Sequence, residues 1–436
     1  MSACYQELAL QGRSGAEVFE RLFWDEPVAV LLESPLLSER TGRYSVLAAR
    51  PRRTLVPPLG QVLPSLKAWL GDVRPVCAGL QELPFRGGLV GWFGYDLAWE
   101  LERLPWLRPD TLPFPVAYWF EPRVFAVADH LYDRLWLVSE EDLEHWQARL
   151  EQPAPRDDIH QQSGLLEWQP DRATFLEMVN QTKAHIRRGD IFQANLSARF
   201  SLARPGGGWQ LYRQLVRVNP SPFASYWRTP YGEVASCSPE RLVELRGRTV
   251  STRPIAGTRP RGTTLDHDAT LAADLLASPK EKAEHIMLVD LERNDLGRVC
   301  RPGTVQVDQL LQIERYSHVM HLVSNITGEL QPDLDAIDLI RAVFPGGTIT
   351  GCPKVRCMEI VETLEPVRRS LFYGSCGYLG YDGELDLNIL IRTLLLSDSR
   401  VWGQVGAGIV ADSDPEREFD EVLDKAKAQW AALGLL

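Results

Sequence analysis

The chain alternates between segments with helical spacing and segments with strand-like spacing of apolar residues. Residues 171–188 place apolar side chains every three or four positions, which predicts an amphipathic helix. Gly189 follows at the position where helices commonly end in a left-handed residue. The apolar stripe of this helix consists of Phe175, Met178, Val179, Thr182 and Ile186.

A second amphipathic helix is predicted near the C-terminus, directly after Asp414 and Pro415. Glu418, Glu421 and Lys425 fall on one face of this helix. Its buried stripe, on another face, would consist of Phe419, Val422, Leu423, Ala426 and Trp430.

Short runs rich in β-branched and aromatic residues predict strands along the whole chain. The polar, Pro-containing stretch 151–164 is the best candidate for a boundary between a region 1–150 and a region 165–436. The expected strands are 28–34, 42–49 and 87–95 before this stretch, and 190–203, 221–229, 233–245, 248–258 and 401–410 after it.

Two acidic pairs, Glu281/Glu284 and Glu418/Glu421, carry most of the chemical information. Each pair has i, i+3 spacing on a predicted helix, so its two carboxylates point the same way. Four carboxylates are costly to gather around one site unless a cation lies among them. Because hard oxygen ligands in small number suit Mg²⁺, the pairs predict a magnesium site.

The first pair stands at a predicted helix N-terminus. Ser278 occupies the N-cap position, Pro279 follows, and Glu281 completes the capping-box pattern, which gives Glu281 a structural task. Glu284 is therefore the better candidate for a metal ligand. We expect this helix to bury Ala283, Met287 and Leu291, and to break at Asn294, Asp295 and Gly297.

Composition narrows the class of protein further. The chain has 436 residues, 44% of them hydrophobic, which is enough for a large core. Its net charge of −11 argues against a nucleic-acid partner. No apolar run reaches membrane-spanning length, and the N-terminus lacks the apolar stretch of a signal peptide. Seven scattered cysteines without CxxC spacing predict reduced thiols in a cytoplasmic protein.

The motifs of the second half together resemble the chorismate-utilising enzymes. This family includes anthranilate synthase component I, aminodeoxychorismate synthase component I, and the isochorismate and salicylate synthases. In the first half, LLES (31–34), GRYS (42–45) and GGLVGWFGYD (87–96) are similar to the amino-utilising branch. The motifs of the second half are SPERL (238–242), STRPIAGTRPRG (251–262), KEKAEHIMLVDLERNDLGRV (280–299), ERYSHVMHLVSNITGEL (314–330), FPGGTITGCPKVRCMEI (344–360), LDLNILIRT (385–393) and GAGIVADSDPEREFDEVLDKA (406–426).

The resemblance implies an α+β fold: two stacked β-sheets, a β-sandwich, surrounded by outer helices, with the active site between the layers. Residues 1–150 would contribute to the same sandwich and carry an amino-acid pocket. Residues 165–436 would form the chorismate-binding catalytic domain.

The resemblance also assigns ligands for the metal and for the substrate. Glu284 and Glu421 would ligate Mg²⁺, with Glu281 and Glu418 in or near its coordination shell. Arg392 and the backbone of Gly406, Ala407 and Gly408 would hold the pyruvyl carboxylate of chorismate. Thr348 and Lys425 would contact the ring carboxylate or a metal-bound water.

Catalytic roles follow from the same resemblance. Glu240 would be the acid that protonates the departing ring hydroxyl, and Thr258 and His321 would lie in the same region. In most aminodeoxychorismate synthases a lysine occupies the position of Ala256 and attacks the ring as a covalent nucleophile. Anthranilate synthases resemble PIAGT there, with ammonia as the nucleophile. Ala256 therefore indicates direct attack by ammonia.

The other motifs divide between two members of the family. FPGGTITGCPKVRCMEI, LDLNILIRT, the polar Asn195 and the Phe372 position resemble aminodeoxychorismate synthase component I. ERYSHVMH and GRYS are closer to anthranilate synthase component I. We favour an aminodeoxychorismate synthase with a PIAGT motif, in p-aminobenzoate and folate biosynthesis, and keep anthranilate synthase, in tryptophan biosynthesis, as the alternative.

Partners and ligands are implied as well. The chain has no Gly-Cys-Leu-Gly elbow of a glutaminase, so ammonia would come from a separate glutamine amidotransferase subunit. A catalytically inactive tryptophan-binding regulator is the lesser alternative, against which the retained acidic pairs and Arg392 argue. A tryptophan pocket is suggested by Glu33, Ser34, Tyr44, Pro222 and Phe223.

Overall fold

Helices and strands stay mixed along the chain, as predicted, in a computed structural model that describes residues 4–35, 42–71, 79–153, 164–203, 207–316, 319–398 and 400–436. The strands are β1 (Cys4–Ala9), β2 (Ala29–Glu33), β3 (Tyr44–Leu55), β4 (Gly88–Phe93), β5 (Ala117–Asp129), β6 (Arg134–Ser139), β7 (Glu167–Gln169), β8 (Gln193–Ala203), β9 (Phe223–Thr229), β10 (Gly232–Ser238), β11 (Arg241–Arg246), β12 (Thr249–Thr252), β13 (Ile255–Pro260), β14 (Gln306–Arg315), β15 (Val319–Glu329), β16 (Gly351–Cys352), β17 (Ser375–Gly380), β18 (Leu385–Asn388), β19 (Thr393–Ser397) and β20 (Arg400–Ile409). The helices are α1 (Gly15–Phe23), α2 (Val62–Leu70), α3 (Ala98–Leu101), α4 (Leu143–Glu151), α5 (Arg172–Arg187), α6 (Gly208–Val218), α7 (Leu265–Ala277), α8 (Pro279–Gly297), α9 (Ala336–Val343), α10 (Lys354–Leu364) and α11 (Pro415–Ala432), with 3₁₀ turns η1 (Tyr95–Leu97) and η2 (Gly347–Ile349).

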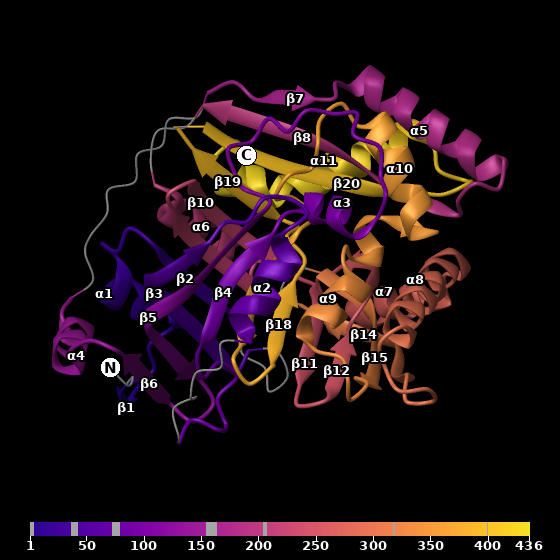
Figure 1. Ribbon diagram of the computed structural model, residues 1–436. Coiled ribbons are helices and arrows are strands. Elements are labelled where there is room, and N and C mark those ends of the chain that lie inside the picture. Colours follow the sequence, from indigo (N-terminus) through magenta and orange to yellow (C-terminus); the bar gives the residue numbers. More distant parts are fainter. Residues whose placement is uncertain are drawn as a thin grey trace.

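The strands pair antiparallel in one hydrogen-bonded network that folds over on itself, giving the expected α+β sandwich (Figure 1). The two halves of the chain share its ladders, because β2 pairs with β9 and β4 pairs with β17. Across the sandwich, Ser225 Oγ on β9 lies 3.5 Å from Cys376 Sγ on β17. The expected boundary stretch falls mostly on residues 154–163, outside the described residues, so the division into 1–150 and 165–436 stays a prediction.

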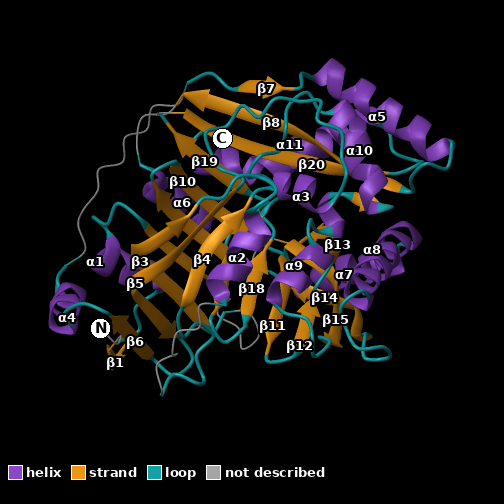
Figure 2. Cartoon of the chain, in the orientation of Figure 1, coloured by secondary structure: helices purple, strands orange, loops and turns teal. Residues whose placement is uncertain are grey.

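Strand alternation separates the interior of the sandwich from the helix-covered outside. On β2, Val30 belongs to the core between the layers, whereas Ala29 and Leu31 pack in a second core with α1. Successive side chains of a strand point to opposite faces, which explains this division. Helices α5 and α11 cover β8 and β20, while α7 and α8 pack against β13 (Figure 2).

Helices α5 and α11 form where the apolar spacing predicts them, and Gly189 has the expected positive φ of 78°. Helix α8 differs from the prediction. It continues through Asn294 and Asp295 to Gly297, because Lys354 Nζ holds the Asp295 carboxylate at 2.5 Å.

The buried face of α8 was also predicted wrongly. Ala283 is exposed and Met287 is half-buried, although Leu291 is buried as expected. Three of the residues that α8 buries are polar, so its apolar spacing could not reveal the register. Its buried residues are His285, Leu288, Val289, Leu291, Glu292, Asp295 and Leu296.

Two further expectations concern thiols and membranes. The cysteines that the structure describes are free thiols, and Cys77 lies outside the described residues. None of the described helices combines the length and the apolar composition needed to cross a bilayer.

Candidate active site

Strands β8 and β20 build one wall of the site. They pair so that Ser197 faces Gly406 and Asn195 faces Gly408. A Cβ atom on Gly406 would lie 2.6 Å from Asn195 Oδ1, and one on Gly408 would lie 2.5 Å from Gln193 Nε2. The two glycines therefore make room for polar side chains of the neighbouring strand.

Ala407, between these glycines, turns its methyl group to the opposite face of β20. This side chain is fully buried in the core beneath α11. Only the backbone of Ala407 is therefore available to a ligand on this wall, and the backbone role expected of residues 406–408 stays a prediction.

Helix α8 brings Glu284 to the same wall. Gln193 Nε2 donates a hydrogen bond of 2.7 Å to Glu284 Oε1. Burial raises the pKa of Glu284, and the neighbouring Glu281 carboxylate raises it further, against the hydrogen bond from Gln193. Glu281 itself turns to Arg259, whose Nη1 lies 3.3 Å away. Its backbone N–H donates to the Ser278 cap at 3.4 Å.

Helix α11 brings the second acidic pair. Burial raises the pKa of Glu418, and Glu421 adds to this shift. Lys425 Nζ donates to the Gly406 carbonyl at 2.9 Å and pairs with Glu421 at 2.8 Å. Lys425 also lowers the pKa of both Glu284 and Glu418, so its ammonium group on α11 acts on carboxylates of both helices.

Carboxylates are suitable ligands for a divalent cation, but these side chains do not form a complete coordination shell. In the described part of the chain, no three His, Cys, Asp or Glu side chains gather closely enough to hold a metal ion. The four predicted glutamates therefore do not converge as one cluster. Mg²⁺ in enzymes commonly uses one or two carboxylates and completes its shell with water and substrate oxygens. The half-buried Glu284 and the second acidic pair, in which Glu418 is buried next to Glu421, offer carboxylates of that kind.

A buried carboxyl group, Glu240, lies between β10 and β11. Burial raises its pKa to about 7, opposed by Thr348, the Ile255 backbone and Arg392. Its Oε1 is buried and has no hydrogen-bond partner among the described residues. A carboxyl group that stays partly protonated near neutral pH can serve as a general acid.

His321 and Thr258 meet across strands β15 and β13. Thr258 Oγ1 and His321 Nδ1 are 3.0 Å apart, at paired positions of the two strands. Burial lowers the pKa of His321 to about 3, and Arg392 acts in the same direction, so the imidazole is neutral at physiological pH. Ala256, two residues before Thr258, is buried on β13 and contributes no functional group.

Arg392 lies in the same region in a left-handed backbone conformation, with φ of 50°. Its Nη1 contacts Asn219 Oδ1 at 3.4 Å, and both residues line a small cavity with His321. Burial lowers the pKa of Arg392. Arg392 has no ion pair with a described carboxylate, and a half-buried guanidinium of this kind is a natural partner for a substrate carboxylate.

Several buried polar atoms in this region have no hydrogen-bond partner among the described residues, so they have hydrogen-bonding capacity that a ligand could use. Asn195 connects the wall formed by β8 and β20 to the turn η2, because its Nδ2 donates to the Thr348 carbonyl at 3.4 Å. Sequence reasoning did not assign Gln193, Asn219 or Tyr373 to the site, although Gln193 shares the QANL segment with Asn195. The unpartnered atoms here, among the described residues, are Gln193 Oε1, Asn195 Oδ1, Asn219 Nδ2, Glu240 Oε1, His321 Nε2, Thr348 Oγ1 and Tyr373 Oη.

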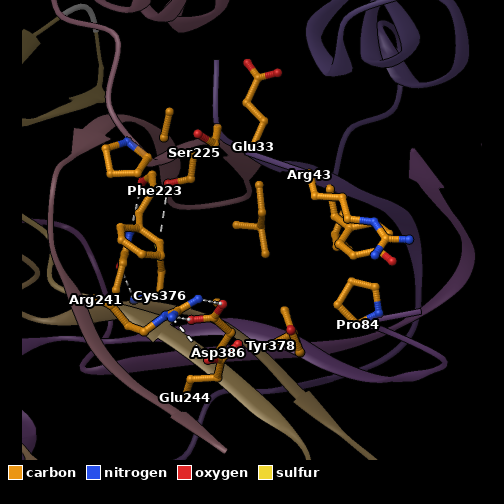
Figure 3. Close-up of a pocket in the computed structure, with 18 of the residues that line it drawn as sticks. Glu33, Arg43, Pro84, Phe223, Ser225, Arg241, Glu244, Cys376, Tyr378 and Asp386 are labelled. Atoms are coloured by element: carbon orange, nitrogen blue, oxygen red, sulfur yellow. Dashed lines mark hydrogen bonds and ion pairs between the residues drawn. The ribbon is translucent and has the colours of Figure 1, made fainter. Parts of the chain in front are cut away.

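A separate cavity of about 410 Å³ lies between the two layers of the sandwich (Figure 3). All five residues of the expected tryptophan pocket line it: Glu33, Ser34, Tyr44, Pro222 and Phe223. At its floor, Arg241 forms ion pairs with Asp386 at 2.8 Å and with Glu244 at 3.1 Å. The cavity therefore has a charged side and, at Leu32, Val46 and Phe223, an apolar side.

Comparison with known proteins places this geometry in a family. The model of the chorismate binding enzyme family matches residues 41–431. An anthranilate synthase component I-like protein of Synechocystis sp. is 54% identical, covering 98% of this chain and 91% of that protein. Aminodeoxychorismate synthase component 1 of Bacillus subtilis is 40% identical, covering 99% of this chain and 97% of that protein.

A solved structure agrees with these relatives. Anthranilate synthase component I from Streptococcus pneumoniae superposes with a TM-score of 0.81 at 34% identity, covering 90% of this chain and 93% of that one. The chain belongs to the family of chorismate-binding enzymes, which confirms the resemblance and the fold inferred from the sequence.

Proposed function

We propose that the chain is aminodeoxychorismate synthase component I, which converts chorismate and ammonia into 4-amino-4-deoxychorismate and water. The observation that carries this choice is the position of Asn195. Its amide lies between Gly406 and Thr348, and its Oδ1 has no hydrogen-bond partner among the described residues. This oxygen could accept a hydrogen bond from a polar group of the substrate, which an apolar residue at 195 could not do. The motifs around residues 344–360 and 385–393 and the similarity to the Bacillus subtilis enzyme support the same choice.

The chain's own residues divide the work at the substrate. Arg392 and the backbone N–H groups of Gly406–Gly408 would bind the pyruvyl carboxylate, and Thr348 and Lys425 would orient the ring carboxylate. Glu240 would give its proton to the ring hydroxyl, which leaves as water. Ammonia supplies the new C–N bond and loses a proton, so atoms and charge balance over the reaction.

Magnesium is part of this proposal. Glu284 and Glu421 would hold the ion, with Glu281 and Glu418 close to it. When bound, Mg²⁺ would offset the ring carboxylate's charge and act as a Lewis acid there.

Ammonia takes the place of a lysine nucleophile on this hypothesis. The methyl group of Ala256 cannot attack the ring, so ammonia would add at C2, followed by a second ammonia at C4, or would substitute directly at C4. A separate glutamine amidotransferase subunit in the cytoplasm would supply the ammonia. Free ammonium should support turnover without that subunit.

Anthranilate synthase component I is the second candidate, favoured by Ala256 and by the similarity to the Synechocystis and Streptococcus proteins. Incubation of the purified chain with chorismate, Mg²⁺ and ammonium distinguishes the two. We expect p-aminobenzoate only after addition of an aminodeoxychorismate lyase. Blue-fluorescent anthranilate as the main product would overturn our choice, and binding of tryptophan without any turnover would favour the inactive regulator.

We further propose that the interlayer cavity binds tryptophan. Its volume lies within the range of about 300–1,000 Å³ typical of small-molecule sites. An aromatic amino acid would place its ring against Val46 and Phe223 and its charged groups beside Arg241 and its two carboxylate partners. The Glu33 carboxyl group points away from the cavity, because its Oε1 accepts a hydrogen bond of 2.7 Å from Tyr212 (Figure 3). Pro222 lines both this cavity and the small cavity at Arg392, which would allow occupancy of one to affect the other.

A further inference from the structure

Gln193, the first residue of β8, is a buried amide next to the first acidic pair. It is 5% exposed, and its Nε2 donates to Glu284 Oε1 at 2.7 Å. Its own Oε1 is buried and has no hydrogen-bond partner in the described part of the chain. One half of this amide therefore holds a carboxylate, while the other half has a hydrogen-bonding capacity that the protein leaves unused.

The backbone around Gln193 is held on both sides. Its carbonyl accepts a hydrogen bond of 3.0 Å from Cys357 Sγ, and it pairs with Cys352 on β16. The preceding residue, Phe192, donates its N–H to the Cys352 carbonyl at 2.8 Å. The side chain thus starts from a fixed point at the edge of β8.

Gly408 provides the space that the amide occupies. A Cβ atom at this position would lie 2.5 Å from Gln193 Nε2 and 3.4 Å from Glu284 Oε1. The first of these distances is a severe clash. The contact of Glu284 with β8 and β20 therefore depends on the absence of a side chain at 408 and on the amide at 193.

The neutral amide of Gln193 distinguishes its contact with Glu284 from an ion pair. A lysine or arginine at 193 would neutralise Glu284 and compete with any cation. A neutral amide orients the carboxylate and leaves its charge in place. Groups that orient a metal ligand in this way typically change metal affinity by about 10–100-fold when they are removed.

We propose that Gln193 is the positioning residue of Glu284: its N–H₂ group fixes one carboxylate oxygen so that the other is free for a divalent cation, and its Oε1 accepts a hydrogen bond from water or substrate at that cation. This inference rests on the cation site of the proposed function. The probe is Mn²⁺, followed by electron paramagnetic resonance, together with the Mg²⁺ dependence of turnover.

Gln193→Met keeps the length of the side chain and removes the amide. We expect about tenfold weaker Mn²⁺ binding and about a tenfold higher Mg²⁺ concentration at half-maximal turnover, with kcat at saturating Mg²⁺ changed less than threefold. Gln181→Met is the matched control, because the exposed Gln181 also donates to a glutamate, Glu177, at 2.9 Å on α5. It should leave both quantities unchanged.

Gly408→Ala tests the same contact with Gln193 intact, because the added methyl group would displace the amide. It should weaken Mn²⁺ binding at least as much as Gln193→Met, and circular dichroism would verify that both variants are folded. Unchanged Mn²⁺ affinity in folded Gln193→Met would overturn the positioning role alone. Absence of Mn²⁺ binding by the wild-type chain would instead overturn the cation site, and with it this inference.

Discussion

Arg369 and Glu365 form an ion pair of 2.8 Å in which both side chains are almost completely buried. Arg369 also donates to the carbonyls of Ile349, at 2.7 Å, and Asn195, at 2.6 Å. Glu365 accepts from the Ser197 backbone N–H at 2.8 Å. The pair thus joins β8 to the turn η2, which carries Thr348, and so helps to fix the position of β8 at the candidate site.

Removal of one member of this pair should be strongly destabilising. Arg369→Met leaves Glu365 as an uncompensated buried charge, which costs about 3–5 kcal/mol of unfolding free energy. Urea unfolding measures this loss. Arg356 forms a more exposed ion pair of 2.6 Å with Glu359 on the preceding helix α10, so Arg356→Met should cost less than about 1 kcal/mol. Equal losses of unfolding free energy in the two variants would contradict our view that burial makes the Arg369–Glu365 pair costly to break.

Glu240→Gln should abolish most of the activity without loss of substrate binding. The amide has the shape of the carboxyl group but cannot release a proton to the departing hydroxyl, a contribution of roughly 10²–10⁴-fold. We expect kcat to fall by about that factor and the KM for chorismate to change less than threefold. A variant that retains a third of wild-type kcat would exclude Glu240 as the acid.

The stability of the protein should depend on pH through the same carboxyl group. The pKa of Glu240 rises from 4.5 to about 7 on folding, so its contribution is complete below pH 4.5 and is lost as pH rises through about 7. Glu240→Gln has no such ionisation. Its melting temperature relative to wild type should therefore increase between pH 5 and pH 8, and a constant difference would show that the group is not protonated in the fold.

Asn195→Val tests the choice between the two products. Loss of the amide removes the unpartnered oxygen beside Gly406, so we expect formation of aminodeoxychorismate to fall about tenfold in kcat/KM, which corresponds to about 1.4 kcal/mol. Chromatography with absorbance and fluorescence detection would follow both products. Asn180→Val, on the exposed face of α5, is the control. An unchanged rate and product in Asn195→Val would remove the main support for our assignment.

The interlayer cavity gives a binding prediction that does not depend on turnover. Isothermal titration calorimetry should detect tryptophan binding to the wild-type chain, and Phe223→Ala should weaken it at least tenfold by removing an apolar wall. Leu131→Ala, at an exposed position, should bind like the wild type. Binding that is unaffected by Phe223→Ala would place tryptophan elsewhere.

Local patterns were sufficient for several elements of this protein. The apolar spacing of α5 and α11 predicted both helices, and Ser278 and Pro279 predicted the start of α8. The same reasoning failed within α8. Its buried face includes Glu292 and Asp295, which are stabilised by Thr252 and Lys354 from distant parts of the chain. A pattern of apolar residues cannot report burial that is compensated by remote partners.

The sequence by itself determined the family, because the family is carried by short motifs that can be read residue by residue, and it supplied the acidic pairs as candidates for the site. Only the tertiary structure decided which atoms meet. It brought Gln193 to Glu284, Thr258 to His321 and Asn195 to Gly406 through the registers of β8, β13, β15 and β20. These contacts join residues 63 to more than 200 positions apart, so no local spacing could predict them.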